Sequence, residues 1–135
     1  MNPKKCILIV DDEEEITRFI LRGILNKRGQ IYDPVICVDG HEALDLMRKK
    51  PVALVILDIQ MRSLDGMEVC QQARLDEALK TIPILVSSGM LGDENKKKLR
   101  ALGVKDFLDK PFRMDDLLLR IDALTQEAPS GFYLT

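Results

Sequence analysis

The sequence is poor in the residues that form the commonest nucleophilic and metal-binding sites. It contains one histidine, His41, and three widely spaced cysteines that form no CxxC pair, namely Cys6, Cys37 and Cys70. Without His41, which lies at a predicted helix start, no Ser–His–Asp or Cys–His arrangement can form. The cysteines lie in or beside apolar segments and are therefore expected to be buried free thiols. No glycine-rich phosphate-binding loop follows the first apolar stretch.

Long hydrophobic runs and a strong excess of charge are also absent. No apolar run approaches the length of a membrane span, and the formal net charge is only -2. This charge gives no reason to expect nucleic acid or an anionic membrane as a partner. The first apolar run, which ends before Asp11, is too short for a signal peptide. We therefore expect a cytoplasmic protein.

Short apolar stretches alternate with helical patterns along the chain. Five strands are expected at Ile7–Val10, Val35–Val38, Val52–Leu57, Ile82–Val86 and Val104–Leu108. Near-continuous apolar runs of this length indicate strands that are buried on both faces of a parallel sheet. The (βα)5 order predicts a single doubly wound α/β domain over residues 4–126, followed by a tail or linker at 127–135.

The starts and ends of several helices carry local signals. Asp39 is followed three residues later by Glu42, and an Asp–x–x–Glu pattern of this kind indicates a helix start. Asp65 and Glu68 repeat the pattern after the third strand. The glycines at positions 29 and 103 are expected to end the first and fourth helices.

Four of the expected strands end in complementary polar residues. Asp11 and Asp12 follow the first strand, Asp58 the third, Ser87 the fourth, and Lys110 lies just after the fifth. Right-handed crossovers bring the carboxyl ends of parallel strands to one edge of the sheet, where ligands of open α/β sheets bind. These three carboxylates, one hydroxyl and one ammonium are therefore expected to meet.

Converging carboxylates repel one another, so something must offset that cost. Mg²⁺, which prefers oxygen ligands, and the ammonium of Lys110 are the two candidates. Both can act together if the ligand is an anion that undergoes phosphoryl transfer. Because no catalytic histidine is available, a carboxylate is left as the nucleophile, and Asp58 stands alone at the end of a central strand.

Four motifs, taken together, resemble a known family. They are Ile9–Glu13, Leu57–Met61 followed by Asp65–Gly66, Val86–Gly89, and Asp106–Phe112. On these motifs the chain resembles the receiver domain of two-component response regulators, of the chemotaxis-regulator type, from about Lys4 to Gln126. The resemblance implies a flavodoxin-like fold with a parallel five-stranded sheet in the order 2-1-3-4-5.

The resemblance also implies roles for the acidic residues. Asp58 would accept a phosphoryl group from a sensor histidine kinase or a histidine phosphotransfer protein. Asp12 and the backbone carbonyl of Gln60 would bind Mg²⁺ beside Asp58, with Asp11 acting largely through water. The acyl phosphate would be lost by slow self-dephosphorylation.

Further roles fall on the ends of the last two strands. Ser87 would be the hydroxyl that turns toward the phosphoryl group, and Lys110 its countercharge. Phe107 matches the aromatic position that changes with activation in this family. The face made by the fourth helix, fifth strand and fifth helix would contact a downstream effector.

Two alternatives remain beside this reading. One is a phosphohydrolase with an aspartyl intermediate, which would need a second carboxylate where Gln60 stands. The other is a degenerate receiver that acts only by binding. The sequence also departs from the family pattern at Arg62, where proline is usual, and at Ser88, where alanine or glycine is usual.

Overall fold

The computed structural model describes residues 3–61 and 65–126, so Arg62 and the expected tail at 127–135 lie outside the described residues. Five strands are observed, β1 (Lys5–Val10), β2 (Tyr32–Cys37), β3 (Leu54–Asp58), β4 (Ile84–Ser88) and β5 (Asp106–Asp109). They alternate with five helices, α1 (Glu14–Arg28), α2 (Gly40–Lys49), α3 (Gly66–Leu75), α4 (Asp93–Ala101) and α5 (Met114–Leu124).

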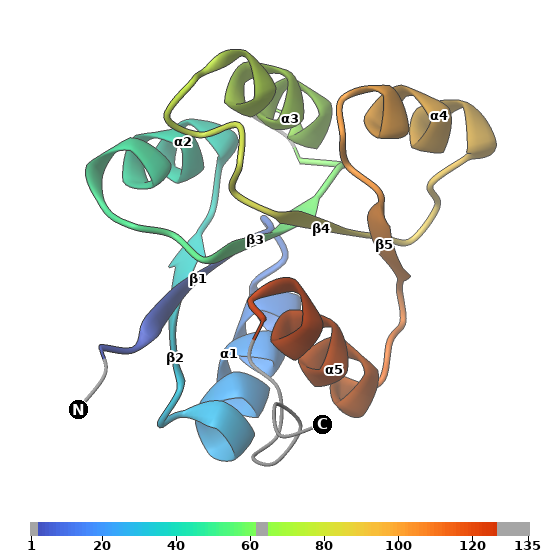
Figure 1. Cartoon of the computed structure of the whole chain (residues 1–135). Coiled ribbons are helices and arrows are strands. Elements are labelled where there is room, and N and C mark those ends of the chain that lie inside the picture. The colour runs from blue at the N-terminus through green and yellow to red at the C-terminus, as the bar shows by residue number, and fades with distance from the viewer. Residues whose placement is uncertain (1–2, 62–64, 127–135) are drawn as a thin grey trace, which may run out of the picture.

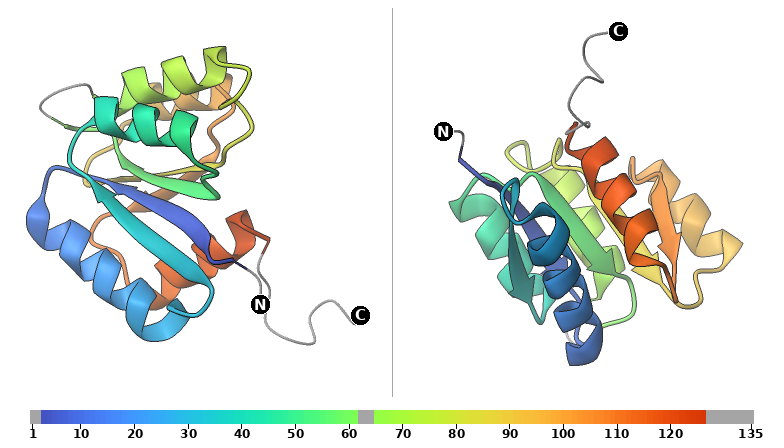
Figure 2. Two further views of the ribbon diagram at one scale, coloured as in Figure 1. Left: turned by 90° about the vertical axis from the view of Figure 1, so that its left-hand side faces the viewer. Right: turned by 90° about the horizontal axis from the view of Figure 1, so that it is seen from below.

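The strands form one parallel sheet in the order β2-β1-β3-β4-β5. Helices α1 and α5 cover one face, and α2, α3 and α4 cover the other (Figures 1 and 2). The predicted α/β class, strand order and flavodoxin-like topology are therefore confirmed.

The core consists of two apolar layers that are separated by the sheet. In β1, Ile7 and Ile9 pack toward α1 and α5, whereas Leu8 and Val10 pack toward α2 and α3. All four side chains are fully buried. Successive strand residues point to opposite faces, so a strand covered on both sides must be apolar at every position. This requirement explains the unbroken apolar runs in the sequence.

The bounds of β2 and β5 differ from the sequence prediction. Strand β2 begins at Tyr32, earlier than expected, and ends at Cys37, leaving Val38 59% exposed. Pro34 fits in β2 because β2 is an edge strand of the sheet. On such a strand the missing N–H of proline need not leave a carbonyl of the neighbouring strand without a hydrogen-bond donor. Strand β5 begins at Asp106, because the N–H of Val104 instead donates to the carbonyl of Leu99 at the end of α4.

Strands β3 and β4 also begin later than their apolar runs, at Leu54 and Ile84, and they extend through Asp58 and Ser88. The polar residues expected just beyond these strands are therefore part of the hydrogen-bonded ladder. Their backbones are fixed by the sheet, which limits the positions that their side chains can reach.

The predicted helix caps and the buried thiols are confirmed. The carboxylate of Asp39 accepts from the N–H of Glu42 at 2.8 Å, and that of Asp65 accepts from the N–H of Glu68 at 3.0 Å. The φ of Gly103 is +84°, in the left-handed region that favours glycine after a helix. All three cysteines are free and buried. No helix among residues 3–61 and 65–126 is long and apolar enough to cross a bilayer.

Gly66 is a position where a side chain does not fit, so Gly66→Ala tests the packing beside β3. An added Cβ would lie 2.5 Å from the carbonyl oxygen of Asp58 and 2.6 Å from the Cα of Ile59. We expect the free energy of unfolding, measured in urea, to fall by about 1–3 kcal/mol, the usual cost of overpacking.

Gly89→Ala is the matched control, because an added Cβ there would meet no atom within 4 Å. Its effect should stay within about 0.5 kcal/mol. Equal destabilisation by the two substitutions would contradict this account of Gly66.

Candidate functional site

The carboxyl ends of β1 and β3 bring three carboxylates together. Val10 pairs with Leu57 in the ladder, so Asp11 and Asp12 leave β1 beside Asp58. One oxygen of each of these three carboxylates lies within 4.8 Å of the others. Asp11 and Asp58 are buried, whereas Asp12 is exposed at the mouth of the cluster. The convergence expected for these residues is therefore observed.

Lys110 reaches this cluster from the residue after β5. Its ammonium Nζ lies 2.8 Å from Oδ2 of Asp11 and 3.5 Å from Oδ2 of Asp58. A third carboxylate, that of Glu13, lies 3.7 Å away. The backbone of Lys110 is held in place because its N–H donates to the carbonyl of Ser88 at 3.0 Å. The peptide bond between Lys110 and Pro111 is cis.

Each buried carboxylate has one oxygen fixed by the backbone. Oδ1 of Asp58 accepts from the N–H of Gln60 at 3.0 Å, and Oδ1 of Asp11 accepts from the N–H of Glu13 at 2.9 Å. The other oxygen of each carboxylate faces Lys110. The two acids are thus oriented by their own loops, and their Oδ2 atoms share a single cation.

The pKa values of Asp58 and Lys110 report the charge balance of the cluster. Burial raises the pKa of Asp58, the Gln60 N–H lowers it, the nearby Asp11 charge raises it, and Lys110 lowers it, with a net rise. For Lys110, burial lowers the pKa, but the hydrogen bond to Asp11 and the charges of Asp11, Asp58 and Glu13 outweigh burial, so the pKa is raised. The ammonium is therefore firmly charged, and the carboxylates exceed it in number.

Two hydroxyl groups near the cluster have no hydrogen-bond partner in the described part of the chain. The Oγ atoms of Ser87 and Ser88 are both buried and unpaired. Ser87 lies directly opposite Asp58 in the β3–β4 ladder. Buried hydroxyls are normally hydrogen-bonded, and an exception calls for a specific explanation. A ligand oxygen beside Asp58 is one partner that Ser87 could take.

The donor set of the acidic cluster suits a metal ion. Three carboxylate oxygens within reach of one another are the hard ligands that divalent cations such as Mg²⁺ take. The three carboxylates carry more negative charge than the single ammonium of Lys110 can neutralise, and this excess favours the binding of such an ion. The triad of Asp11, Asp12 and Asp58 can therefore bind a metal ion.

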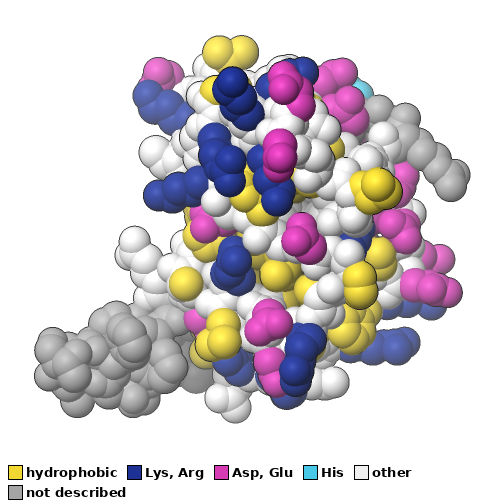
Figure 3. Space-filling model, turned by 90° about the vertical axis from the view of Figure 1, so that its right-hand side faces the viewer, with side chains coloured by type: hydrophobic (Ala, Val, Ile, Leu, Met, Phe, Trp, Pro, Cys, Tyr) yellow, Lys and Arg dark blue, Asp and Glu magenta, His cyan; other side chains and the backbone are white. Residues whose placement is uncertain are grey.

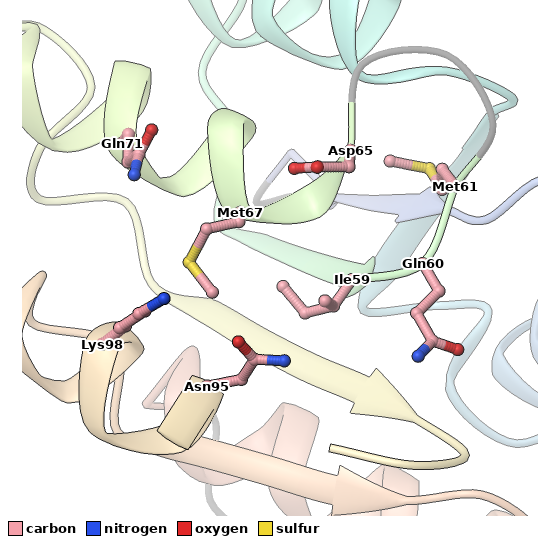
Figure 4. Close-up of a pocket in the computed structure, with 8 residues that line it drawn as sticks. All are labelled: Ile59, Gln60, Met61, Asp65, Met67, Gln71, Asn95 and Lys98. Carbon is pink, nitrogen blue, oxygen red and sulfur yellow. The ribbon is translucent and has the colours of Figure 1, made fainter. Parts of the chain in front are cut away.

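Gln60 lies between this cluster and a hollow of about 570 Å³. The hollow is formed by the loop after β3 and by α3 and α4, and Figure 4 shows Gln60 at its edge, beside Ile59 and facing Asn95. The N–H of Gln60 contacts Asp58, but the expected metal contact of its carbonyl stays a prediction.

The sequence did not predict the contacts that two residues make at the site. Glu13 contacts Lys110, and the carbonyl of Ser88 holds the Lys110 backbone. Glu13 directly follows Asp12, and Ser88 directly follows Ser87. This adjacency to predicted site residues was the only sign in the sequence that they lie at the site. Their contacts depend on the conformation of Lys110, which the sequence pattern does not specify.

Comparisons with known proteins agree with this geometry. The family model described as the response regulator receiver domain matches residues 7–122. The response regulator MprA of Mycolicibacterium vanbaalenii is 39% identical over 120 residues, covering 87% of this chain and 49% of the relative. The transcriptional regulatory protein PhoP of Bacillus subtilis is 34% identical over 124 residues, covering 92% and 50%. The chain thus spans about half the length of these curated relatives.

Solved structures show the same architecture. The chemotaxis protein CheY4 of Vibrio cholerae superposes with a TM-score of 0.82 at 26% identity, covering 90% of this chain and 99% of that one. The receiver domain of the Francisella response regulator 1452 gives a TM-score of 0.79 at 28% identity, covering 91% and 98%. The chain is therefore similar to receiver domains and to chemotaxis regulators along most of its length.

The buried charge of Asp58 should cost stability, and Asp58→Asn tests this. Because burial raises the pKa of Asp58, the fold disfavours its ionised form, and at pH 7 the asparagine variant should be more stable. The expected gain in the free energy of unfolding is about 1 kcal/mol, as for other changes that relieve a functional site. The gain should disappear as the pH falls below ~4, where the carboxyl is protonated in both states.

Urea denaturation at pH 7 and at low pH, in the presence of a chelator, measures this difference. Asp45→Asn, an exposed change on α2, is the control and should shift stability by less than about 0.5 kcal/mol. A destabilised Asp58→Asn protein at pH 7 would contradict the account.

Proposed function

The chain belongs to the response regulator receiver domain family, and from that membership we propose that Asp58 is its phosphoryl-accepting residue. Receiver domains take part in two-component signal transduction, and they are phosphoacceptors rather than enzymes acting on a separate substrate. The phosphohydrolase alternative is therefore not supported. The observation that carries the proposal is the buried Asp58 carboxylate, oriented by the Gln60 N–H and faced by Lys110 at 3.5 Å.

The donor we propose is a phosphohistidine of a sensor histidine kinase or of a histidine phosphotransfer protein, since receiver domains partner with histidine kinases. Oδ2 of Asp58 attacks phosphorus and forms the O–P bond. The N–P bond breaks, and its electron pair stays on the imidazole nitrogen of the donor. Later attack by water on phosphorus returns the Asp58 carboxylate and inorganic phosphate, which is the slow self-dephosphorylation expected of the domain.

Charge neutralisation on two sides supports this reaction. We propose that Mg²⁺ is held by Asp12, by Asp58 and by the carbonyl of Gln60, with Asp11 acting through water. When bound, the ion would neutralise charge on the phosphoryl oxygens. From the other side, Lys110 leaves its contact with Asp58 and pairs with a phosphoryl oxygen, while its contact with Asp11 keeps it in place. The 2.8 Å distance between Lys110 and Asp11 supports this positioning.

Ser87 would couple the phosphorylation of Asp58 to a conformational change of the domain. We propose that its hydroxyl, unpaired and opposite Asp58, donates to the phosphoryl group and thereby shifts a two-state equilibrium of the domain. The α4–β5–α5 face then contacts a downstream effector. We place this function in a cytoplasmic domain over residues 4–126, with 127–135 as a tail or linker.

Phosphorylation can be measured directly by intact mass after incubation with acetyl phosphate. We expect a gain of one phosphoryl group that requires Mg²⁺ and is absent from Asp58→Asn. No gain in the wild-type protein, together with no binding of the phosphoryl mimic beryllofluoride, would instead indicate a degenerate receiver.

The two unpaired hydroxyls offer a matched pair of variants. Ser87→Ala should slow the accumulation of phosphoprotein by about tenfold, the effect of losing one hydrogen bond of ~1.4 kcal/mol to a charged group. Ser88→Ala removes a hydroxyl that is equally buried but lies opposite Asp109 rather than Asp58, and it should change the rate by less than about twofold. Equal effects of the two substitutions would exclude a specific role for Ser87.

A further inference from the structure

A second hollow, of about 1570 Å³, lies at the edge of the sheet opposite the acidic cluster. Its walls are formed by residues that lead into β1, β2, β3 and β4, together with the end of α5. The amino ends of parallel strands meet at this edge, as the carboxyl ends meet at the other. Figure 2 shows the start of β1 and the end of α5 at the same end of the molecule. We call this cavity the base hollow.

Buried hydrogen bonds hold the walls of the base hollow in place. The hydroxyl of Tyr32 donates to Oδ1 of Asp122 at 2.7 Å and lies 2.9 Å from Oγ1 of Thr125. The other oxygen of Asp122 accepts from Arg28 at 3.1 Å, and the ammonium of Lys5 donates to the carbonyl of Thr125 at 2.9 Å. The end of α5 is thus fastened to α1, β1 and β2. The hollow is therefore formed before any ligand arrives, as is usual for small-molecule sites.

The inner surface of the base hollow is mostly aliphatic and offers few backbone donors. Three prolines, which have no N–H, are among its lining residues, namely Pro3, Pro51 and Pro83. The N–H of Lys5 already donates to the carbonyl of Ile31, and that of Ala53 to the carbonyl of Cys6. A ligand rich in hydrogen-bonding groups would lose more to desolvation here than it regained. An aliphatic ligand body fits this surface better.

The charged groups around the base hollow are mainly cationic. Lys4, Lys5 and Lys50 line it, against the single acid Asp33 among the described lining residues. Within residues 3–61 and 65–126, neither Lys4 nor Lys50 forms an ion pair. Burial raises the pKa of the Cys6 thiol and outweighs the charge and hydrogen bond of Lys50, which lower it. The Lys50 ammonium therefore lies beside Cys6 at the hollow, where it can meet an anionic head group.

We propose that the base hollow binds a fatty carboxylate with a single aliphatic chain. The carboxylate pairs with Lys4 and Lys50, and the chain lies against Ile31, Val52 and Leu124. No aromatic side chain is among the described lining residues, so an aromatic ligand would find no ring to stack on. The excess of cations over the single acid favours one anionic head group. This site goes beyond the function proposed for Asp58 and does not depend on it.

Calorimetric titration of the whole chain with sodium decanoate, at low salt and below the concentration at which micelles form, tests the site. We expect a Kd below about 1 mM. Octanoate, whose chain is shorter, should bind roughly tenfold more weakly, because each buried methylene group tightens binding by up to about fourfold. No binding of decanoate, or equal Kd values for the two chain lengths, would overturn the proposal.

Two double variants separate the lysines of the hollow from net charge. Lys4→Gln with Lys50→Gln should raise the Kd for decanoate about fivefold. Lys97→Gln with Lys105→Gln removes the same charge from α4 and the loop after it, on the face where Figure 3 shows many dark-blue side chains, and should raise the Kd less than about twofold. An equal rise in both double variants would indicate attraction by net charge alone and would overturn the site.

Asp33→Asn removes the acid of the hollow and should tighten decanoate binding about twofold. Weaker binding in this variant would contradict the pairing of the carboxylate with the lysines. In amide NMR spectra of the wild-type protein, decanoate should shift the signals of Ile31, Ala53 and Leu124. Shifts confined to other parts of the chain would overturn the location.

A membrane surface presents the same anionic and aliphatic chemistry, so it needs an experiment of its own. The whole chain is sedimented with vesicles of phosphatidylglycerol and phosphatidylcholine. We expect the protein to stay in the supernatant, because the hollow accepts a single free chain. Sedimentation that is lost in the variant with Lys4→Gln and Lys50→Gln would assign these lysines to a membrane surface and would overturn the proposal.

Discussion

The contact of Lys110 with two buried carboxylates is the interaction on which the site depends. Its ammonium lies 2.8 Å from Asp11 and 3.5 Å from Asp58, and without it two negative charges would face each other at low solvent exposure. One cation cannot neutralise both acids together with the exposed Asp12. The remaining negative charge is what allows the site to take up a metal ion.

This contact exists only because of the sheet topology. Asp11, Asp58 and Lys110 are far apart in the sequence, and parallel strands with right-handed connections place the ends of β1, β3 and β5 along one edge. Between β3 and β5, β4 contributes Ser87 beside Asp58 and the Ser88 carbonyl that holds the Lys110 backbone. Close packing of Gly66 against the Asp58 backbone fixes the start of the following loop. The packing of the core thus fixes the backbone positions of the charged residues at the edge of the sheet.

The fold and the convergence of the acidic residues were predictable because each rests on a simple pattern. Apolar runs indicate buried parallel strands, and strand ends of such sheets meet at one edge. The limits of β2 were not predictable in the same way, since Tyr32-Asp33-Pro34 does not show the apolar pattern of a strand, and only its edge position lets it pair. The contacts of Glu13 and of the Phe107 ring were not predicted either. Both depend on long side chains, Lys110 for one and Lys96 with Arg100 for the other, and sequence spacing does not determine the conformations of such side chains.

The central claim is that Asp58 carries the phosphoryl group while Lys110 and a divalent cation neutralise it from two sides. A crystal structure of the chain with beryllofluoride and Mg²⁺ tests this claim most directly. The account predicts beryllium bonded to an Asp58 oxygen, Lys110 within hydrogen-bonding distance of a fluoride, and Mg²⁺ bound by Asp12 and Asp58. Beryllofluoride at another carboxylate, or Lys110 directed away from the fluorides, would contradict it.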